Sequence, residues 1–200
     1  LPEEQTVPDN LFLSPSGSAM IMADQYGQYT RVCNNSFYPL VTSDSDEIVS
    51  FDRLISVVWS GDESLLALAE KEQITLYNQN YEAVVRIPTT DQQVGWIGFW
   101  EQNLLVVTEE ALYRYDLSGR LLTEIPIAPV STPCSCTLMV SRRGSLALMV
   151  NQQLCLINTT DWQSYASVSD CLYYDQENGI IYTLGEIDNV LQVGSYEEYD

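Results

Sequence analysis

The sequence predicts an all-β fold made of a repeated four-stranded unit, and three observations support this prediction. Apolar runs of similar shape begin at Ser18, Ser64, Asn103, Ser145 and Gly179, so they recur about every forty residues. Short segments rich in Gly, Ser, Asp and Asn separate the runs, and no long stretch has helical periodicity. This period is expected of a propeller blade. We therefore predict a β-propeller of about five four-stranded antiparallel blades, or a partial propeller from a larger chain.

The strands of each unit are predicted in chain order. First strands are expected in "LFLSP", "SVVWS", "IGFWE", "TLMVS" and "CLYYD", ahead of the five runs named above. Third strands follow in "YTRVC", "ITLYN", "LYRYD", "QLCLI" and "VLQVG". A fourth, less regular strand is predicted in "EAVVRIP", "LLTEIPI" and "QSYASVS". The connectors "SPSGS", "SGDES", "SRRGS" and "DQENG" predict tight turns, because Gly and Asp tolerate the backbone angles that hairpins need.

We predict a single propeller-like domain over residues 1–200, with repeats at approximately 10–53, 54–94, 95–134, 135–170 and 171–200. The last repeat has only three predicted strands, so residues 1–9 are a candidate for its missing outer strand, which would close the ring. The rival interpretation is that further blades lie outside the sequence. The chain begins at Leu1, which fits either a removed leader or a start inside a longer protein.

One position of the repeat is apolar throughout. The last residue of each predicted first strand is Leu13, Trp59, Trp100, Val140 or Tyr174. A recurring large apolar group in a repeat usually packs one unit on the next. We therefore expect these side chains to lie between blades.

Two segments carry a family resemblance. "ISVVWSGDESLLALAEKEQITLYN" resembles WD40-type repeats in its apolar strand, Ser-Gly-Asp turn, Leu-Ala strand and Asn ending. "EEALYRYDLSGRLLTEI" is similar to the repeats of quinoprotein-like propellers, in which a Leu-Tyr strand precedes Asp, a Gly turn and an outer strand. The likeness covers nearly the whole chain and implies a propeller fold. The chain departs from the WD40 pattern because it has neither a "WD" dipeptide nor a histidine for the "GH" signature.

The charge of the chain restricts its partners. Eight basic residues stand against 28 acidic ones, which gives a formal net charge of −20. Nucleic acid and anionic membrane surfaces are disfavoured because a negative field repels both, and the apolar runs are too short to insert into a membrane. A protein partner with a basic surface would be attracted. The acidity also keeps a folded chain in solution without any partner.

The residue types present remove many catalytic mechanisms. Without histidine the chain cannot build a Ser-His-Asp triad, a Cys-His pair or a His-bearing zinc site. The one lysine, Lys71, follows no glycine-rich phosphate loop. We predict no catalytic residue, no metal site and no cofactor. Carboxylates alone could still support a hydrolase or a calcium site, and a central ring of Asp or Glu from the inner strands would favour that alternative.

Two short segments are candidate interaction loops. Asp44, Asp46 and Glu47 form the densest internal acidic cluster, in "SDSDE", which lacks the Gly and the distal Glu of a calcium loop. Arg142 and Arg143 are the only basic doublet and fall on a predicted tight turn. Each segment is either a contact edge or a plain solvated loop or turn.

The five cysteines leave at least one thiol free or bonded to another chain. Cys134 and Cys136 are two apart, which on a strand places both side chains on one face in a poor geometry for bonding each other. Cys155 and Cys171 could meet between neighbouring strands, or either could meet the Cys134/Cys136 pair. The alternative is that these thiols pack as small hydrophobic groups.

The leading functional hypothesis is a non-enzymatic propeller scaffold that mediates protein–protein interaction within a larger assembly. The first alternative is a carboxylate- or divalent-ion-dependent propeller hydrolase or ligand-binding protein. The second is a structural repeat unit of an extracytoplasmic assembly. The compartment stays open between a cytosolic peripheral complex and an extracytoplasmic location, and the redox state of the thiols would separate them.

Overall fold

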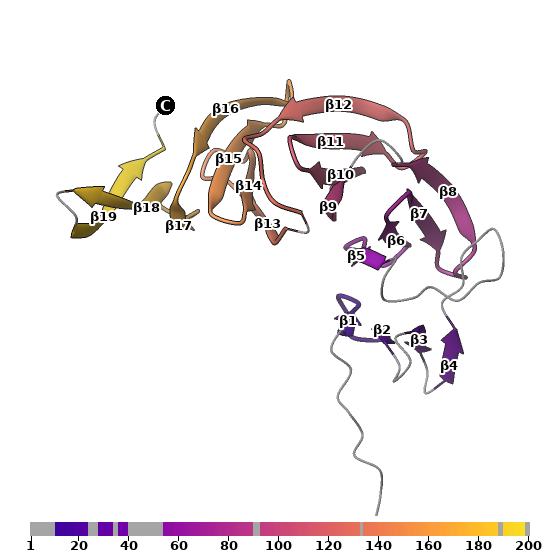
Figure 1. Cartoon of the computed structure of the whole chain (residues 1–200). Helices are drawn as coiled ribbons and strands as arrows, with labels where there is room; N and C mark the ends of the chain where they lie inside the picture. Colours follow the sequence, from indigo (N-terminus) through magenta and orange to yellow (C-terminus); the bar gives the residue numbers. More distant parts are fainter. Residues whose placement is uncertain are drawn as a thin grey trace, which may run out of the picture.

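The computed structural model describes residues 11–23, 28–33, 36–39, 54–89, 93–132, 134–187 and 190–198. All regular secondary structure in these ranges is β-strand, arranged as five antiparallel sheets that follow one another along an arc (Figure 1). The same ranges contain no helix that is long and apolar enough to cross a membrane. The predicted all-β architecture with about five sheet units is confirmed.

The first two sheets are four-stranded meanders in which each strand pairs with its neighbour in sequence. The first sheet contains β1 (Leu11–Leu13), β2 (Ala19–Ala23), β3 (Tyr29–Cys33) and β4 (Ser36–Pro39). The second sheet contains β5 (Leu54–Trp59), β6 (Leu65–Glu70), β7 (Gln73–Asn78) and β8 (Ala83–Pro88).

The next two sheets repeat this meander. The third sheet contains β9 (Val94–Trp100), β10 (Asn103–Thr108), β11 (Ala111–Asp116) and β12 (Leu121–Pro126). The fourth contains β13 (Cys136–Val140), β14 (Leu146–Val150), β15 (Gln153–Asn158) and β16 (Gln163–Val168). Figure 1 shows β5, β9 and β13 on the concave side of the arc, whereas β8, β12 and β16 lie on its convex side.

The fifth sheet has three strands, β17 (Cys171–Asp175), β18 (Ile180–Ile187) and β19 (Val190–Glu197). Its three strands match the three that the sequence predicts for the last repeat. The segment 1–9, the candidate for a fourth strand, lies outside the described residues.

Two kinds of turn recur at one edge of the sheets. In the turn between the first and second strands a left-handed residue is needed. It is Gly17, Gly144 or Gly179 in three sheets, but a glutamate in the other two, namely Glu63 (φ 56°) in the second sheet and Glu101 (φ 51°) in the third. Such a backbone conformation strains any residue that carries a Cβ atom. The second and third sheets therefore each hold a strained glutamate at this turn.

In the second, third and fourth sheets the turn between the third and fourth strands begins with Asn or Asp, whose side-chain oxygen accepts backbone N–H groups of the turn. These starting residues are Asn78, Asp116 and Asn158. A left-handed residue follows in each turn, namely Tyr81 (φ 62°), Gly119 (φ 85°) and Trp162 (φ 56°). Two of the three turns thus hold a large aromatic side chain where glycine is favoured.

The described residues form four hydrophobic clusters, one between each pair of successive sheets. Alternate residues of a middle strand face opposite neighbours, as the pleat of a strand requires. Leu66 and Leu68 of β6 pack toward the first sheet, while Ala67 and Ala69 pack toward the third. Each sheet is therefore buried by its neighbours rather than by a common centre.

The side chains at the recurrent apolar position, the last residue of each predicted first strand, differ in how far they are buried. Trp59 and Tyr174 are buried between sheets, and Trp100 is half-buried. The expectation of packing between blades is wrong for Leu13 and Val140, which are 57% and 53% exposed. No described sheet precedes Leu13. At the interface next to Val140 the buried aromatic side chain is Trp162, and Trp96 and Trp100 of the third sheet pack against the same cluster.

Candidate binding pocket between the first two sheets

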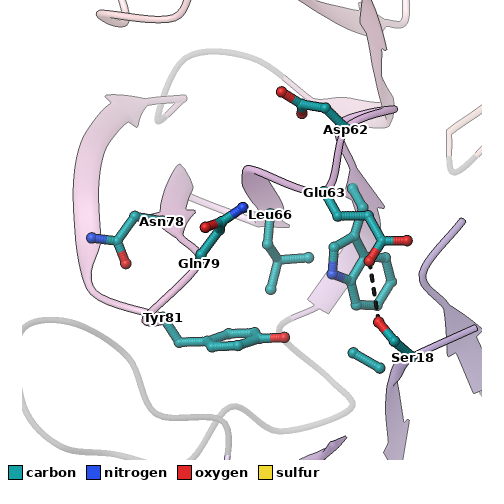
Figure 2. Close-up of a pocket in the computed structure, with 9 residues that line it drawn as sticks. Ser18, Asp62, Glu63, Leu66, Asn78, Gln79 and Tyr81 are labelled. Atoms are coloured by element: carbon teal, nitrogen blue, oxygen red, sulfur yellow. Dashed lines mark hydrogen bonds between the residues drawn. The ribbon is translucent and has the colours of Figure 1, made fainter. Parts of the chain in front are cut away.

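A pocket of about 380 Å³ lies between the first and second sheets, beside the turns described above (Figure 2). The first sheet contributes the edge at Ser18, where the turn after β1 enters β2. The second sheet contributes the rest of the wall from its two recurrent turns and from the apolar side chains between them. The pocket therefore exists only because two repeats meet.

Asp62 supplies a carboxylate to the pocket from the turn between β5 and β6. Its Oδ1 accepts hydrogen bonds from the Ser60 hydroxyl at 2.7 Å, the Ser64 hydroxyl at 2.8 Å and the Ser64 N–H at 3.1 Å. The Ser60 hydroxyl, and after it the Ser64 N–H, lowers the pKa of Asp62 to about 2. Asp62 is consequently ionised at neutral pH.

Glu63 bridges the two sheets at the pocket. Its carboxylate accepts the Ser16 N–H at one oxygen and the Ser18 hydroxyl at the other, where the distance is 3.2 Å (Figure 2). The Ser16 N–H is the main cause of a lowered pKa of Glu63. This contact gives a structural reason for the strained backbone of Glu63, because a glycine there could not reach the neighbouring sheet.

The rest of the pocket wall is apolar, except at one edge where side-chain amides line it. Trp59 and Leu66 are nearly buried and form part of the lining. In Figure 2 Leu66 lies between Gln79 on one side and Glu63 on the other, with the ring of Tyr81 below it. The pocket thus combines aromatic and aliphatic surface with two carboxylates at its turns.

The guanidinium group of Arg31, in the first sheet, lies over the ring of Tyr81, in the second sheet. The guanidinium carbon of Arg31 lies 3.6 Å from the centroid of the Tyr81 ring and 4.5 Å from that of Tyr38. A guanidinium group on an aromatic face is attracted by the ring quadrupole. The Nε atom of Arg31 is buried and has no hydrogen-bond partner among the described residues.

The acidic candidates Asp44, Asp46 and Glu47 lie outside the described residues. The two arginine candidates contact the fifth sheet of their own chain. Arg142 donates from Nη1 to the Asn178 carbonyl and from its backbone N–H to the Tyr174 hydroxyl, each at 3.1 Å. The Nε of Arg143 lies 3.7 Å from a carboxylate oxygen of Glu198.

Glu198 is the centre of this contact between the fourth and fifth sheets. Its carboxylate accepts the hydroxyls of Tyr165 and Tyr174, each at 2.6 Å, and its side chain is only 2% exposed. Burial, and after it the bond to Glu198, raises the pKa of Tyr174 to about 12. The Arg142–Arg143 turn therefore helps to join two sheets, which the sequence did not predict.

The four cysteines whose side chains are described are all free thiols. The sulfurs of Cys134 and Cys136 are 3.6 Å apart, closer than the predicted strand geometry implies. Cys155 and Cys171 do not meet, because the Cys155 sulfur lies 3.9 Å from the Ser167 hydroxyl in one cluster and Cys171 packs in another. Burial raises the pKa of both thiols.

None of the pocket residues is predicted as a site from the sequence. One signal was present in the aligned turns, where Glu63 stands at the position held by Gly17, Gly144 and Gly179. The partner of Glu63 could not be found in this way, because the Ser16 N–H is 47 residues away.

No protein-family model matches the chain, and no curated protein matches its sequence. The structure is similar to that of KlHsv2 with loop 6CD replaced by a Gly-Ser linker, with a TM-score of 0.60 and 12% sequence identity. The match covers 95% of this chain and 71% of that chain. At this identity the likeness shows the fold alone, a β-propeller, and the five sheets of this chain correspond to about five blades.

Proposed function

We propose that the protein is a non-enzymatic propeller scaffold that binds another protein within a larger assembly, and that the pocket between the first two sheets receives a basic side chain of that partner. The observation that carries the proposal is the pairing of two carboxylates, Asp62 and Glu63, with aromatic and aliphatic walls in one pocket. A lysine or arginine side chain has the matching chemistry, an apolar stem that ends in a cation.

The charge of the pocket and the net charge of the whole chain both favour a cationic partner. Hydrogen bonds lower the pKa of both pocket carboxylates, so the pocket carries negative charge at neutral pH. The whole chain has a formal charge of −20, which speeds the approach of a basic partner and repels an acidic one. The Tyr81 ring and the Trp59 side chain would cover the methylene stem.

The small number of carboxylates in the first strands of the sheets supports binding rather than carboxylate catalysis. Among β1, β5, β9, β13 and β17, the described residues include a single carboxylate, Asp175, at the very end of β17. Its Oδ2 is hydrogen-bonded to the Asn178 amide at 2.8 Å. A ring of acids at the centre, which would favour the hydrolase alternative, is therefore not formed by these strands.

The test is capture of partners at low salt, with mass spectrometry of whatever stays bound in stoichiometric amount. Wild type is compared with the double variant Asp62→Asn, Glu63→Gln and with the matched control Asp161→Asn, Glu177→Gln. The control removes two exposed turn carboxylates far from the pocket, one of which accepts a backbone N–H as Asp62 does. We expect one protein to be retained by wild type and by the control and to be lost by the pocket variant.

A second measurement uses the captured protein and its variants with single Lys or Arg residues replaced by Gln. Each pocket charge removed should weaken binding by about two- to fivefold, because exposed ion pairs are individually modest. One basic residue of the partner should become ineffective once Asp62 and Glu63 are neutral. A partner that binds the pocket variant as well as wild type would contradict the proposal, as would stoichiometric capture of a small molecule without any protein.

A further inference from the structure

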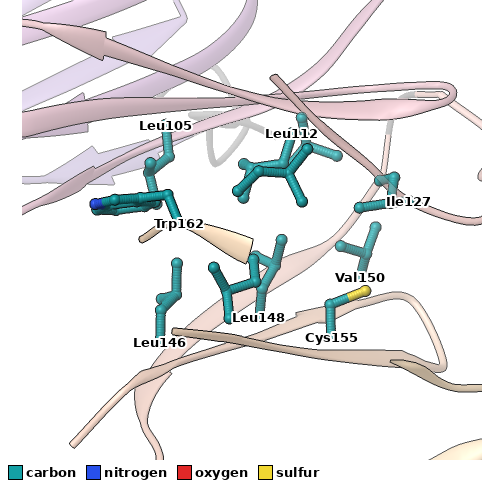
Figure 3. Packing of buried hydrophobic residues seen from close by; sticks show 11 residues of the cluster. Leu105, Leu112, Ile127, Leu146, Leu148, Val150, Cys155 and Trp162 are labelled. Carbon is teal, nitrogen blue, oxygen red and sulfur yellow. The ribbon is translucent and has the colours of Figure 1, made fainter. Parts of the chain in front are cut away.

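Cys134 and Cys136 form a close thiol pair at the boundary of the third and fourth sheets. Their sulfur atoms are 3.6 Å apart, which is van der Waals contact, and both residues are partly exposed. They pack against the apolar cluster that also holds Cys155. Figure 3 shows Cys155 within this cluster. A disulfide bond requires about 2.05 Å, so the sulfurs would need to approach by about 1.6 Å.

The backbone explains why two side chains that a strand would leave apart come together. β13 begins at Cys136, so Cys134 precedes the strand and is free of its extended geometry. Ser135, between them, is held from both sides by Asn151, whose side-chain oxygen accepts the Ser135 N–H at 3.2 Å and whose own N–H donates to the Ser135 carbonyl at 2.8 Å. The two hydrogen bonds to Asn151 thus fix the position of Ser135, the residue between the two cysteines.

Gly95 of β9 gives the Cys134 sulfur its space. A Cβ atom at Gly95 would lie 2.8 Å from that sulfur and 2.9 Å from the Thr132 methyl group. The Cys134 N–H also points at the Gly95 carbonyl, at 3.4 Å. The third sheet therefore fixes the first thiol while Asn151 of the fourth sheet fixes the residue next to it.

The two thiols differ in acidity because they interact. The hydrogen bond from Cys136 is the main reason for a lowered pKa of Cys134, whereas the same bond and burial raise the pKa of Cys136. Cys134 is thus the more readily ionised of the two, and the thiolate is the reactive form of a thiol.

We propose that Cys134 and Cys136 are a dithiol site that small disulfides of the glutathione type convert reversibly to an intrachain disulfide. The inference is independent of the pocket between the first two sheets. It assigns to this edge a covalent modification that would tie the connector before β13 to the first residue of that strand.

The exchange proceeds in two balanced steps. The Cys134 thiolate attacks one sulfur of oxidised glutathione, the disulfide bond of that reagent breaks, and one glutathione thiolate leaves and takes a proton from water. The Cys136 thiol then loses its proton to solvent and attacks the Cys134 sulfur, which releases the second glutathione. The two cysteines are oxidised, the reagent is reduced to two thiols, and added thiol reverses both steps.

The test incubates the folded protein with oxidised glutathione and follows every cysteine by differential alkylation and peptide mass spectrometry. A Cys33→Ser background removes the fifth thiol. We expect the Cys134–Cys136 disulfide to form at least about tenfold faster than any adduct on Cys155 or Cys171, whose pKa is raised by burial. In urea this selectivity should disappear, because it arises from the fold.

Single variants separate the two roles. Cys136→Ser should stop at a stable glutathione adduct on Cys134, and Cys134→Ser should slow modification of Cys136 at least about tenfold. Asn151→Gly retains the left-handed backbone but removes the side-chain acceptor, so it should slow only the closure step. Equal reactivity of Cys155, or a glutathione adduct on wild-type Cys134 that never closes, would overturn the proposal, and both are measured without any variant at the pair.

Discussion

The interface between the first and second sheets and that between the third and fourth are built on the same repeat positions. In each, an arginine from the third strand of one sheet lies on the aromatic ring at the left-handed turn position of the next. The guanidinium-to-ring distance is 3.6 Å for Arg31 on Tyr81 and 4.1 Å for Arg114 on Trp162. In both arginines Nε is buried and lacks a hydrogen-bond partner among the described residues. The stack is therefore a repeated device for joining sheets.

The two interfaces differ in how completely they are filled. Figure 3 shows Trp162 beside Leu105 and Leu146, and Trp162 is only 7% exposed. At the first interface the smaller Tyr81 is half-buried, and beside it the pocket remains open. Burial lowers the pKa of Arg114, because it disfavours the charged guanidinium. The contact with the Trp162 ring favours the same cationic form.

The difference shows how a repeat scaffold can acquire a site at small cost to its architecture. The pocket requires a smaller aromatic side chain at one turn and a carboxylate in place of glycine at another, while the strands and their register stay the same. Under the proposed function, binding is confined to one interface while the neighbouring interfaces maintain stability. Paired substitutions at equivalent positions test this division.

The largest contrast is expected at the aromatic turn residues. Trp162→Ala should lower the free energy of unfolding by about 4 kcal/mol, because it removes a buried indole and leaves the Arg114 guanidinium without its ring. Tyr81→Ala should cost only about 1–2 kcal/mol, because its ring already borders open space. Chemical denaturation measures both, and equal losses would show that the first interface is as tightly packed as the other.

A smaller contrast is expected between two leucines that pair with equivalent first strands. Leu146 pairs with Val140 and Leu66 pairs with Trp59, and each faces the preceding sheet. Leu146→Ala should cost about 3 kcal/mol, because it leaves a cavity in a filled cluster. Leu66→Ala should cost about 2 kcal/mol, because the new space joins the existing pocket. A larger loss at Leu66 than at Leu146 in equilibrium unfolding would reverse the comparison.

Sequence periodicity was sufficient to find most of the strands. The first, second and third strands of every unit were predicted, as were the fourth strands β8, β12 and β16. β4 was missed because "SFYP" is short and has no alternation, so only its pairing with β3 defines it. Local pattern thus carries the information that a meander needs.

The sites required information that local pattern does not contain. Glu63 looked like an ordinary turn residue, and its role depends on Ser16 in another repeat. Arg142 and Arg143 looked like a surface doublet, yet they contact Tyr174, Asn178 and Glu198 of the next sheet. These contacts depend on how successive sheets are placed, which the hydrophobic alternation of single strands does not specify.

The polar contacts at the last interface predict a loss of stability in alkali. The folded pKa of Tyr174 is about 12, above its ordinary value of 10.0, so the folded protein keeps a proton that the unfolded chain releases. This contribution to stability is fully present below pH 10 and is lost as the pH rises toward 12. Between about pH 9 and 11 the melting temperature of wild type should fall by a few degrees more than that of Tyr174→Phe. Tyr196→Phe, at an exposed position, should behave as wild type.

The smallest expected effect is the acid response of the first interface. The folded pKa values of Asp62 and Glu63 are lowered, so the carboxylates contribute stability above their ordinary values of 3.8 and 4.5, and this contribution is lost as the pH falls through the folded values. The effect is small because both groups are exposed to solvent.

Glu63→Gln isolates this acid response, because the amide oxygen still accepts the Ser16 N–H but does not titrate in this range. In wild type the Ser16 amide resonance should shift with the protonation of Glu63, and the fall in melting temperature below about pH 4 should be shallower in the variant. Trp59 at the first interface should report the change by fluorescence while Trp162 at the filled interface does not. An acid transition that Glu63→Gln leaves unaltered would place the titrating group elsewhere and remove the bridging role of Glu63.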